Sequence, residues 1–282
     1  MGLMNIVIGF AITIAITVLS VTAMLLVRRG APEGSYFTDG DRASGVFGVL
    51  ASGFAILLGF IIFLAFTTYD ASRSGAETEA VLVAQQIETA QFFNADARRE
   101  LTGELVCYGR YVVGPEWDRL RDGSLGDDVN PWSVAMFRTL RRVEPQTGSE
   151  DNAYGKWLDQ TADRQTARQD RVHGSAGVIP TPLWIVLFSI SIVILGYMLF
   201  FADKSEGRVT QSMLMGSVSF VLVALLLLLQ FLDNPYRPGV GSLRPDAMER
   251  TLRIMDKQLE VAGFDEPPPC DAEGTATKAA AK

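Results

Sequence analysis

Residues 46–66 read VFGVLASGFAILLGFIIFLAF, a stretch without a single charged side chain. An α-helix needs roughly 20 apolar residues to cross about 30 Å of hydrocarbon, so this stretch is long enough to span a bilayer. In lipid a backbone satisfies its hydrogen bonds only as a helix or within a closed barrel, and the stretch lacks the alternation of barrel strands. It therefore predicts a transmembrane helix.

Three further apolar stretches are also uncharged, and the four stand two and two around a long polar segment. We therefore expect an all-α integral membrane protein, with four transmembrane helices and a helical domain outside the membrane. Charged residues make up 20% of the chain and fall almost entirely outside the spans. The four spans are expected in residues 5–27, 46–66, 183–202 and 209–232.

These spans divide the chain into five expected parts. They are transmembrane helices 1 and 2 in residues 1–66, the helical domain in 67–180, transmembrane helices 3 and 4 in 181–232, a membrane-proximal helix in 233–264, and a disordered tail in 265–282.

The polar middle segment carries the signals of several helices. Residues 76–93 are rich in good helix formers and should continue the second span into water. We expect the next helix to end at Gly114 and Pro115, because glycine and proline commonly follow a helix. The expected starts of the later helices are Asn94 or Asp96, then Asn130, and then about Ser149.

Catalytic and metal-binding patterns are missing from the sequence. Its two cysteines, Cys107 and Cys270, lie in different segments, and His173 is its one histidine. They give no disulfide framework, no zinc-ligand spacing and no Cys/His nucleophile pair. No glycine-rich phosphate loop or Gly-x-Ser-x-Gly motif occurs. We therefore expect no enzyme, no cofactor and no metal, and the net charge of −7 gives no general attraction to nucleic acid.

Small residues recur along the second span at spacings of three or four. They lie on one face of the helix, where another helix can approach closely, so they predict tight helix packing. These residues are Gly48, Ser52, Ala55 and Gly59.

Ile56, Phe60 and Phe63 lie on an apolar stretch of the same span. A ring of such residues, one from each subunit, would form a hydrophobic constriction that gates by dewetting. The alternative is that they face lipid or pack inside the chain, as apolar residues do in any span. No span contains an acid, a base or a histidine, which argues against a proton-driven transporter but not against a pore.

Four short motifs accompany the two-plus-two arrangement of the spans. They are AETEA at 76–80, YGRYVVGPEW at 108–117, PTPLW at 180–184 and LDNPYRPG at 232–239. In these features the chain resembles the bestrophin-like domain family. The resemblance covers nearly the whole chain up to about residue 252, and the motifs are specific together although each is weak alone.

Bestrophins proper are similar at a greater distance. They are pentameric anion channels with four spans per subunit, a pore lined by the second span and a helical cytosolic domain. The resemblance thus implies a homo-oligomer, a pentamer, that sits in membrane lipid and conducts small ions. Asp233, Asn234 and Pro235 match a bestrophin motif, but the acids that follow it and help bind Ca²⁺ there are absent here, which argues against Ca²⁺ gating.

Three further family-motif residues, Glu79, Glu116 and Trp117, lie in the polar middle segment. They could line a vestibule, but we expect structural roles, because Glu116 follows Pro115 where a helix N-terminus favours an acid. A basic stripe precedes the third span, and we expect it to be a solvated face paired with acids, with lipid headgroups or an anion as the alternative. The stripe consists of Arg164, Arg168 and Arg171.

The orientation in the membrane follows less directly. Four spans place both termini and the helical domain on one face and the two short loops on the other. Arginines and lysines near the membrane divide evenly, but a strict count that ignores loops beyond about 60 residues favours the short loops inside the cell. The resemblance implies the reverse, with the helical domain and both termini in the cytoplasm, and this is our expectation.

Together these observations predict a bestrophin-like oligomeric ion channel in the cell membrane, selective for anions, with a hydrophobic constriction on the second span. The alternative is a membrane-anchored interaction or sensory protein that conducts nothing and recruits a partner through its helical domain.

Overall fold

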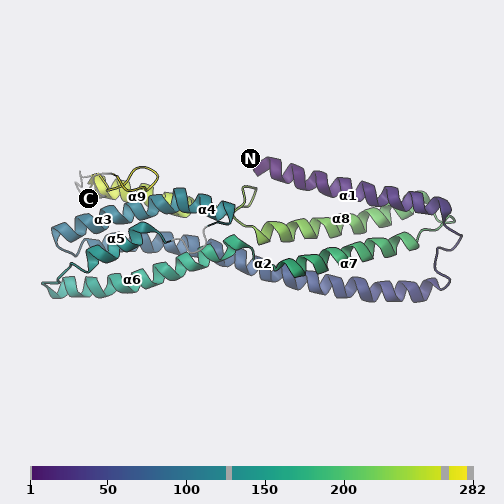
Figure 1. Cartoon of the computed structure of the whole chain (residues 1–282), viewed down its shortest axis with the longest axis horizontal. Helices are drawn as coiled ribbons and strands as arrows, with labels where there is room; N and C mark the ends of the chain where they lie inside the picture. Colours follow the sequence, from purple (N-terminus) through teal and green to yellow (C-terminus); the bar gives the residue numbers. More distant parts are fainter. Residues whose placement is uncertain (1, 125–128, 262–266, 278–282) are drawn as a thin grey trace. The chain divides into compact units, whose positions relative to one another are not determined.

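The computed structural model describes residues 2–124, 129–261 and 267–277, without the side chains of residues 2–6. Two compact units make up the chain. The membrane unit consists of Met1–Thr67, Gly177–Asn234 and Pro238–Gly241, and the helical unit consists of Thr68–Ala176, Pro235–Arg237 and Ser242–Lys282. The helices, labelled in Figure 1, are α1 (Gly2–Gly30), α2 (Gly40–Ala90), α3 (Ala95–Tyr111), η1 (Val112–Glu116), α4 (Trp117–Asp122), α5 (Pro131–Leu140), α6 (Gly148–His173), η2 (Gly174–Ala176), α7 (Thr181–Phe200), α8 (Arg208–Asp233) and α9 (Asp246–Val261).

Four of the described helices, α1, α2, α7 and α8, are long and apolar enough to cross a membrane. At most 33% of the most apolar window of any of them is buried inside the chain. The exposed side chains include Leu19 of α1 and Ile192 of α7, which suit lipid or another subunit rather than water. The predicted all-helical fold with four helices of spanning length is confirmed.

Within the membrane unit α1 packs along α8 (Figure 1). A Cβ atom on Gly216 of α8 would lie 3.5 Å from Val21 Cγ2 and 3.8 Å from Thr17 Cγ2 of α1, so this glycine permits a close approach of the two helices.

Hydrogen bonds join the end of α1 and the α1–α2 loop to the α7–α8 loop in the membrane unit. Arg28, in the last turn of α1, donates hydrogen bonds to the main-chain carbonyls of Asp203 and Lys204, each at 3.0 Å, and to that of Glu206. The amide of Gly34 donates to the Asp203 carboxylate at 3.1 Å. Three donations from one guanidinium therefore hold the α7–α8 loop against the end of α1.

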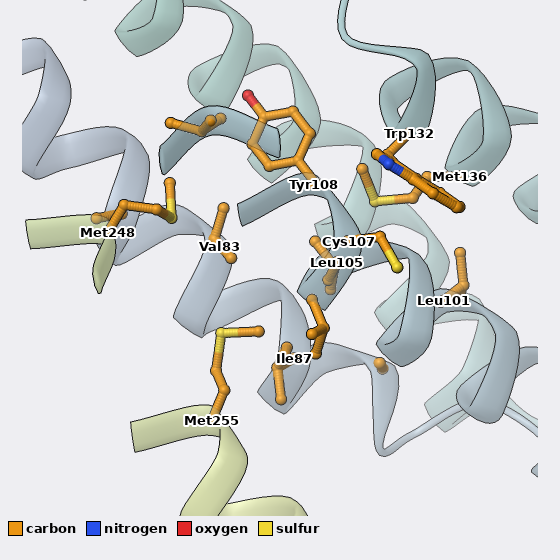
Figure 2. Close-up of a cluster of buried hydrophobic side chains, with 14 of the residues drawn as sticks. Val83, Ile87, Leu101, Leu105, Cys107, Tyr108, Trp132, Met136, Met248 and Met255 are labelled. Atoms are coloured by element: carbon orange, nitrogen blue, oxygen red, sulfur yellow. The ribbon is translucent and has the colours of Figure 1, made fainter. Parts of the chain in front are cut away.

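The helical unit has an apolar core of its own (Figure 2). Two of its helices begin at asparagine caps, as expected: Asn94 Oδ1 accepts from the Ala97 amide at 2.9 Å, and Asn130 Oδ1 accepts from the Trp132 amide at 3.1 Å. The core side chains labelled in Figure 2 are Val83, Ile87, Leu101, Leu105, Cys107, Tyr108, Trp132, Met136, Met248 and Met255.

The prediction that the helix after Asn94 ends at Gly114 and Pro115 is wrong. The helix continues through the π-helical turn η1, which contains Pro115, directly into α4. Proline has no N–H, and in an α-helix its ring would clash with the carbonyl four residues earlier, so a wider turn accommodates it. The continuation leaves both Glu116 and Trp117 buried in the helical unit.

Residues 267–277 also differ from the expected disordered tail. A disulfide joins Cys270 to Cys107 of α3, although the sequence alone gave the two cysteines no framework. Trp132 Nε1 donates to the Gly274 carbonyl at 2.6 Å, and the Thr277 amide donates to the Pro269 carbonyl at 3.0 Å. These bonds give the segment a fixed conformation that its Pro- and Ala-rich composition did not indicate; residues 265, 266 and 278–282 lie outside the described residues.

Candidate pore-lining face and a buried charge cluster

One face of α2 in the membrane unit points away from the rest of the chain. Ile56, Phe60 and Phe63 are 74%, 60% and 61% exposed. Their spacing of four and three residues places them on one side of the helix. Phe54 and Leu58, which lie on another side, are buried. The three residues expected at a constriction are therefore together on a face that lipid or another subunit must cover.

The small residues of α2 are not packed tightly against another helix of the same chain. A Cβ atom added at Gly48 or Gly59 would meet nothing within 4 Å, and Ser52 is exposed. Ala55 and Gly59 line an apolar groove of about 460 Å³ whose other walls come from α7 and α8. Close packing at this stripe is thus not satisfied within the chain and stays a prediction for its contacts with other copies.

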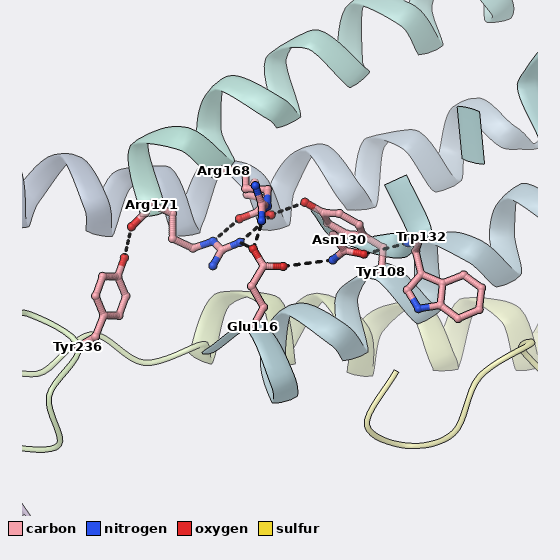
Figure 3. Close-up of polar contacts among 8 residues, drawn as sticks. Tyr108, Glu116, Asn130, Trp132, Arg168, Arg171 and Tyr236 are labelled. Atoms are coloured by element: carbon pink, nitrogen blue, oxygen red, sulfur yellow. Dashed lines mark hydrogen bonds and ion pairs between the residues drawn. The ribbon is translucent and has the colours of Figure 1, made fainter. Parts of the chain in front are cut away.

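A cluster of buried charges lies in the helical unit (Figure 3). Arg171 of α6 donates from Nε to Glu79 Oε2 at 2.5 Å and from Nη2 to Glu79 Oε1 at 3.2 Å. The same Nη2 donates to Glu116 Oε1 at 2.8 Å. All three side chains are 0% exposed. One arginine therefore joins α2, which carries Glu79, to the π turn, which carries Glu116.

Neighbouring groups complete the hydrogen bonding of the two acids. Arg168 Nε donates to Glu116 Oε1 at 2.8 Å, and Asn130 Nδ2 donates to Glu116 Oε2 at 3.2 Å. The Tyr108 hydroxyl donates to Glu79 Oε1 at 2.5 Å. Each carboxylate thus accepts hydrogen bonds from at least two side chains, which is what a buried charge requires to be tolerated.

The electrostatics favour the ionised state of this cluster. Burial alone would raise the pKa of Glu116, but the charges of Arg171 and Arg168 outweigh it, so the pKa of Glu116 is lowered from its usual value. Burial likewise opposes the charge on Arg171, but Glu79 and Glu116 outweigh it and raise the pKa of Arg171. The pKa of Tyr108 is raised by its burial and then by the charge of Glu79, so its hydroxyl keeps the proton that it donates.

Aromatic rings surround the arginine. The guanidinium of Arg171 lies 5.6 Å from the Trp117 ring centroid, and Trp117 meets Tyr236 edge to face at 5.5 Å. The Tyr236 hydroxyl donates to the Arg171 carbonyl. A Cβ atom on Gly75 of α2 would lie 2.6 Å from the Arg171 amide nitrogen, so only glycine permits α2 and α6 to come this close.

The charge cluster was only partly foreseen from the sequence. Arg168 and Arg171 of the basic stripe do pair with acids, but Arg164 and Arg171 are buried rather than solvated. Glu116 makes no side-chain hydrogen bond to the start of α4, so it does not cap that helix as expected. Arg164 lies over the Tyr108 ring at 4.3 Å, and burial lowers its pKa. The available signal was the spacing of the three arginines by four and three residues, which places them on one face of a helix.

Asp233 has a different partner set, inside the membrane unit. Its Oδ1 accepts from the amides of Val178 and Ile179 at 2.7 and 2.9 Å, and its Oδ2 accepts from Trp184 Nε1 at 3.4 Å. Asn234 Nδ2 donates to the Gln230 carbonyl at 3.2 Å. The Asp233 carboxylate therefore joins the end of α8 to the residues just before α7 and to its first turn.

Pro235 lies in the helical unit, where its Cγ would be 3.4 Å from a Cβ atom on Gly174. In the described part of the chain, no three His, Cys, Asp or Glu residues are grouped so that they could hold a metal ion.

Comparison with known proteins adds the family. The model of the bestrophin-like domain matches residues 13–248. No protein with a curated description is significantly similar to the sequence. A point variant of a bacterial bestrophin homologue from Klebsiella pneumoniae is similar in structure over 89% of this chain and 99% of its own, with a TM-score of 0.68 and 15% sequence identity. A solved structure described as a membrane protein matches 86% of this chain and 98% of its own, with a TM-score of 0.67 and 15% identity.

At these identities the solved structures show a shared fold, which is that of a bacterial bestrophin homologue. The four helices of spanning length agree with it and make the protein a multi-pass membrane protein. The family match extends over most of the chain, from the first span to the start of α9, and confirms the resemblance read from the sequence motifs. The chain belongs to the bestrophin-like domain family.

Proposed function

We propose that this protein is an ion channel: a homo-oligomer, pentameric by its resemblance to bestrophins, with a pore on the symmetry axis that is lined by α2. The observation that carries the proposal is the exposed face of Ile56, Phe60 and Phe63 in a chain of this family. These large apolar side chains project from a spanning helix whose small residues Gly48 and Gly59 also lack a close neighbour among the described residues.

The two patterns on α2 fit one arrangement of subunits. At about 100° per residue, the small-residue stripe lies roughly 80° around the helix from the face that carries Phe60. If that apolar face points to the symmetry axis, the small-residue stripe points towards the adjacent subunit. Ala55 and Gly59 would then permit the close approach of a neighbouring helix, as small residues do in membranes.

Rings of isoleucine and phenylalanine would act as a gate. A narrow apolar constriction empties of water, and an ion does not cross it until the ring widens or is wetted. Such a gate needs no titratable group, which agrees with the absence of charged residues from residues 46–66. Selectivity for anions rests on the resemblance to bestrophins alone.

The test is ion conduction by the purified protein in planar bilayers under a KCl gradient. We expect a reversal potential near the chloride equilibrium value, and we expect Phe60→Ala to raise the unitary conductance by about twofold or more, because it removes a ring from the constriction. Phe10→Ala is the matched control: Phe10 is 61% exposed on α1, and its loss should leave conductance unchanged.

Each other outcome is informative. A reversal potential near the potassium value would keep the pore and refute anion selectivity. Equal effects of Phe60→Ala and Phe10→Ala would refute α2 as the pore lining. The absence of ion conduction by a folded oligomer would refute the channel. It would favour a membrane anchor that recruits a partner through its helical unit.

A further inference from the structure

The disulfide between Cys107 and Cys270 joins α3 covalently to residues 267–277. The two Cα atoms are 5.7 Å apart, a normal separation for a disulfide. Both residues are buried, and the sequence contains no other cysteine. The bond is therefore an internal one that is shielded from small reductants.

Several contacts hold the segment that carries Cys270 against α3 and α5. Arg110 Nη1 donates to the Asp271 carbonyl at 3.2 Å, and Trp132 Nε1 donates to the Gly274 carbonyl. Gly274 has φ +79°, and a Cβ atom there would clash with the Tyr111 amide nitrogen. The conformation places Cys270 next to its partner through contacts that do not involve sulfur.

A stable bond of this kind indicates an oxidising compartment. Disulfides persist outside the cytoplasm, whereas cytoplasmic thiol systems keep cysteines reduced. When the bond forms, the two thiols lose two protons and two electrons. The electrons pass by thiol–disulfide exchange to the disulfide of a protein dithiol–disulfide oxidase, which is released as its dithiol.

The charges beside the membrane point the same way. The two short loops carry five arginines and lysines, whereas the segment after the last span carries three within about 18 residues of its end, Arg237, Arg244 and Arg250. The middle segment is too long for its charges to determine orientation. Cytoplasmic loops carry the excess of arginine and lysine, so the short loops belong inside the cell. Their basic residues are Arg28, Arg29, Arg42, Lys204 and Arg208.

We propose that the helical unit and both termini lie outside the cytoplasm, where Cys107 and Cys270 are the substrate pair of a dithiol–disulfide oxidase. This orientation is the reverse of the one that the resemblance to bestrophins implies. It is independent of the proposed channel function, because both a conducting and a non-conducting protein could have this orientation.

The first experiment counts thiols in the unmodified full chain. Intact cells that express it are quenched with acid and denatured, and free thiols are labelled with a polyethylene glycol maleimide. We expect no gel shift before reduction and labelling of both cysteines after it. In cells that lack the dithiol–disulfide oxidase, both should be labelled without reduction. Two free thiols in oxidase-competent cells would overturn the proposal.

The second experiment reads orientation directly, in the background Cys107→Ser with Cys270→Ser. Gln165→Cys places a single thiol on the exposed surface of α6, and Thr38→Cys is its control in the short loop before α2. A membrane-impermeant maleimide should label Gln165→Cys in intact cells and Thr38→Cys only after permeabilisation. The reverse pattern, or labelling of both in intact cells, would overturn the proposal whether or not the disulfide is found.

Discussion

Arg171→Met is expected to destabilise the helical unit more than any other single change in its charge cluster. The substitution keeps an unbranched side chain but leaves Glu79 and Glu116, both 0% exposed, without the cation that they share. Loss of one partner from a buried ion pair costs about 3–5 kcal/mol, because the remaining charge stays buried and uncompensated. Arg168→Met is the matched control. Arg168 is 21% exposed and Glu116 keeps Arg171, so we expect a cost of about 1–2 kcal/mol.

Tryptophan fluorescence during urea unfolding in detergent measures this difference. The chain has four tryptophans, and three of them, Trp117, Trp132 and Trp157, are buried in the helical unit. Their emission should shift to the red as the unit unfolds, so the midpoint and slope give its free energy of unfolding. We expect Trp184, at the start of α7 in the membrane unit, to contribute a background that changes little when the helical unit unfolds.

The pH dependence provides a second criterion. In the native cluster the pKa of Glu116 is lowered, so its contribution to stability is present at neutral pH and is lost as the pH falls through its ordinary value of 4.5 and below. In Arg171→Met the same carboxyl would have a raised pKa and would regain stability on protonation. The difference in the free energy of unfolding between the native protein and the variant should therefore become smaller as the pH falls from 7 to 4. A gap below about 1 kcal/mol at pH 7, an equal cost for Arg168→Met, or a gap independent of pH would refute the reasoning.

Three further changes test other parts of the structure. Gly75→Ala would place Cβ 2.6 Å from the Arg171 amide nitrogen and should cost about 1–3 kcal/mol in thermal unfolding, whereas Gly155→Ala, with nothing within 4 Å, should be neutral or stabilising. Burial raises the pKa of Glu104 to about 7, so the free energy of unfolding of the native protein should fall as the pH rises from 4.5 through 7. In urea titrations Glu104→Gln should be as stable as the native protein at pH 4 and more stable by up to about 3 kcal/mol at pH 8. Parallel pH profiles of the two proteins would contradict this. Asp233→Ala leaves two backbone N–H groups without their acceptor and should lower the midpoint of thermal aggregation in detergent, by a cost of about 1–3 kcal/mol, while Asp233→Asn keeps the acceptor and should cost less.

The parts of the fold that the sequence predicts well are those with strong local signals. Uncharged stretches such as residues 46–66 have no alternative to a spanning helix, and α2 continues past them as the helix formers of residues 76–93 indicated. Asn94 and Asn130 begin α3 and α5 because a cap needs only a side-chain oxygen and the next two or three amides. Interactions within a few residues are readable from the sequence.

The features that were missed depend on residues far apart in the chain. Glu79 and Arg171 are separated by 92 residues, and Cys107 and Cys270 by 163. The sequence around each of these residues contains no local pattern that predicts such a pairing. The continuation of the helix through Pro115 was missed for a related reason: a π turn is rare, and it is stabilised here by burial of Glu116 in a cluster that only the folded unit creates.

The family-motif residues differ from the exposed residues of α2 in what they contact within the chain. Glu79, Glu116 and Asp233 all direct their carboxylates at partners within their own unit. Sequence similarity at these positions therefore reports how the chain folds. Ile56, Phe60 and Phe63 are mostly exposed, so burial inside their own chain does not account for them. Whatever covers that face, lipid or an adjacent subunit around a pore, determines the function, and a substitution there separates conduction from folding in a way that a motif substitution does not.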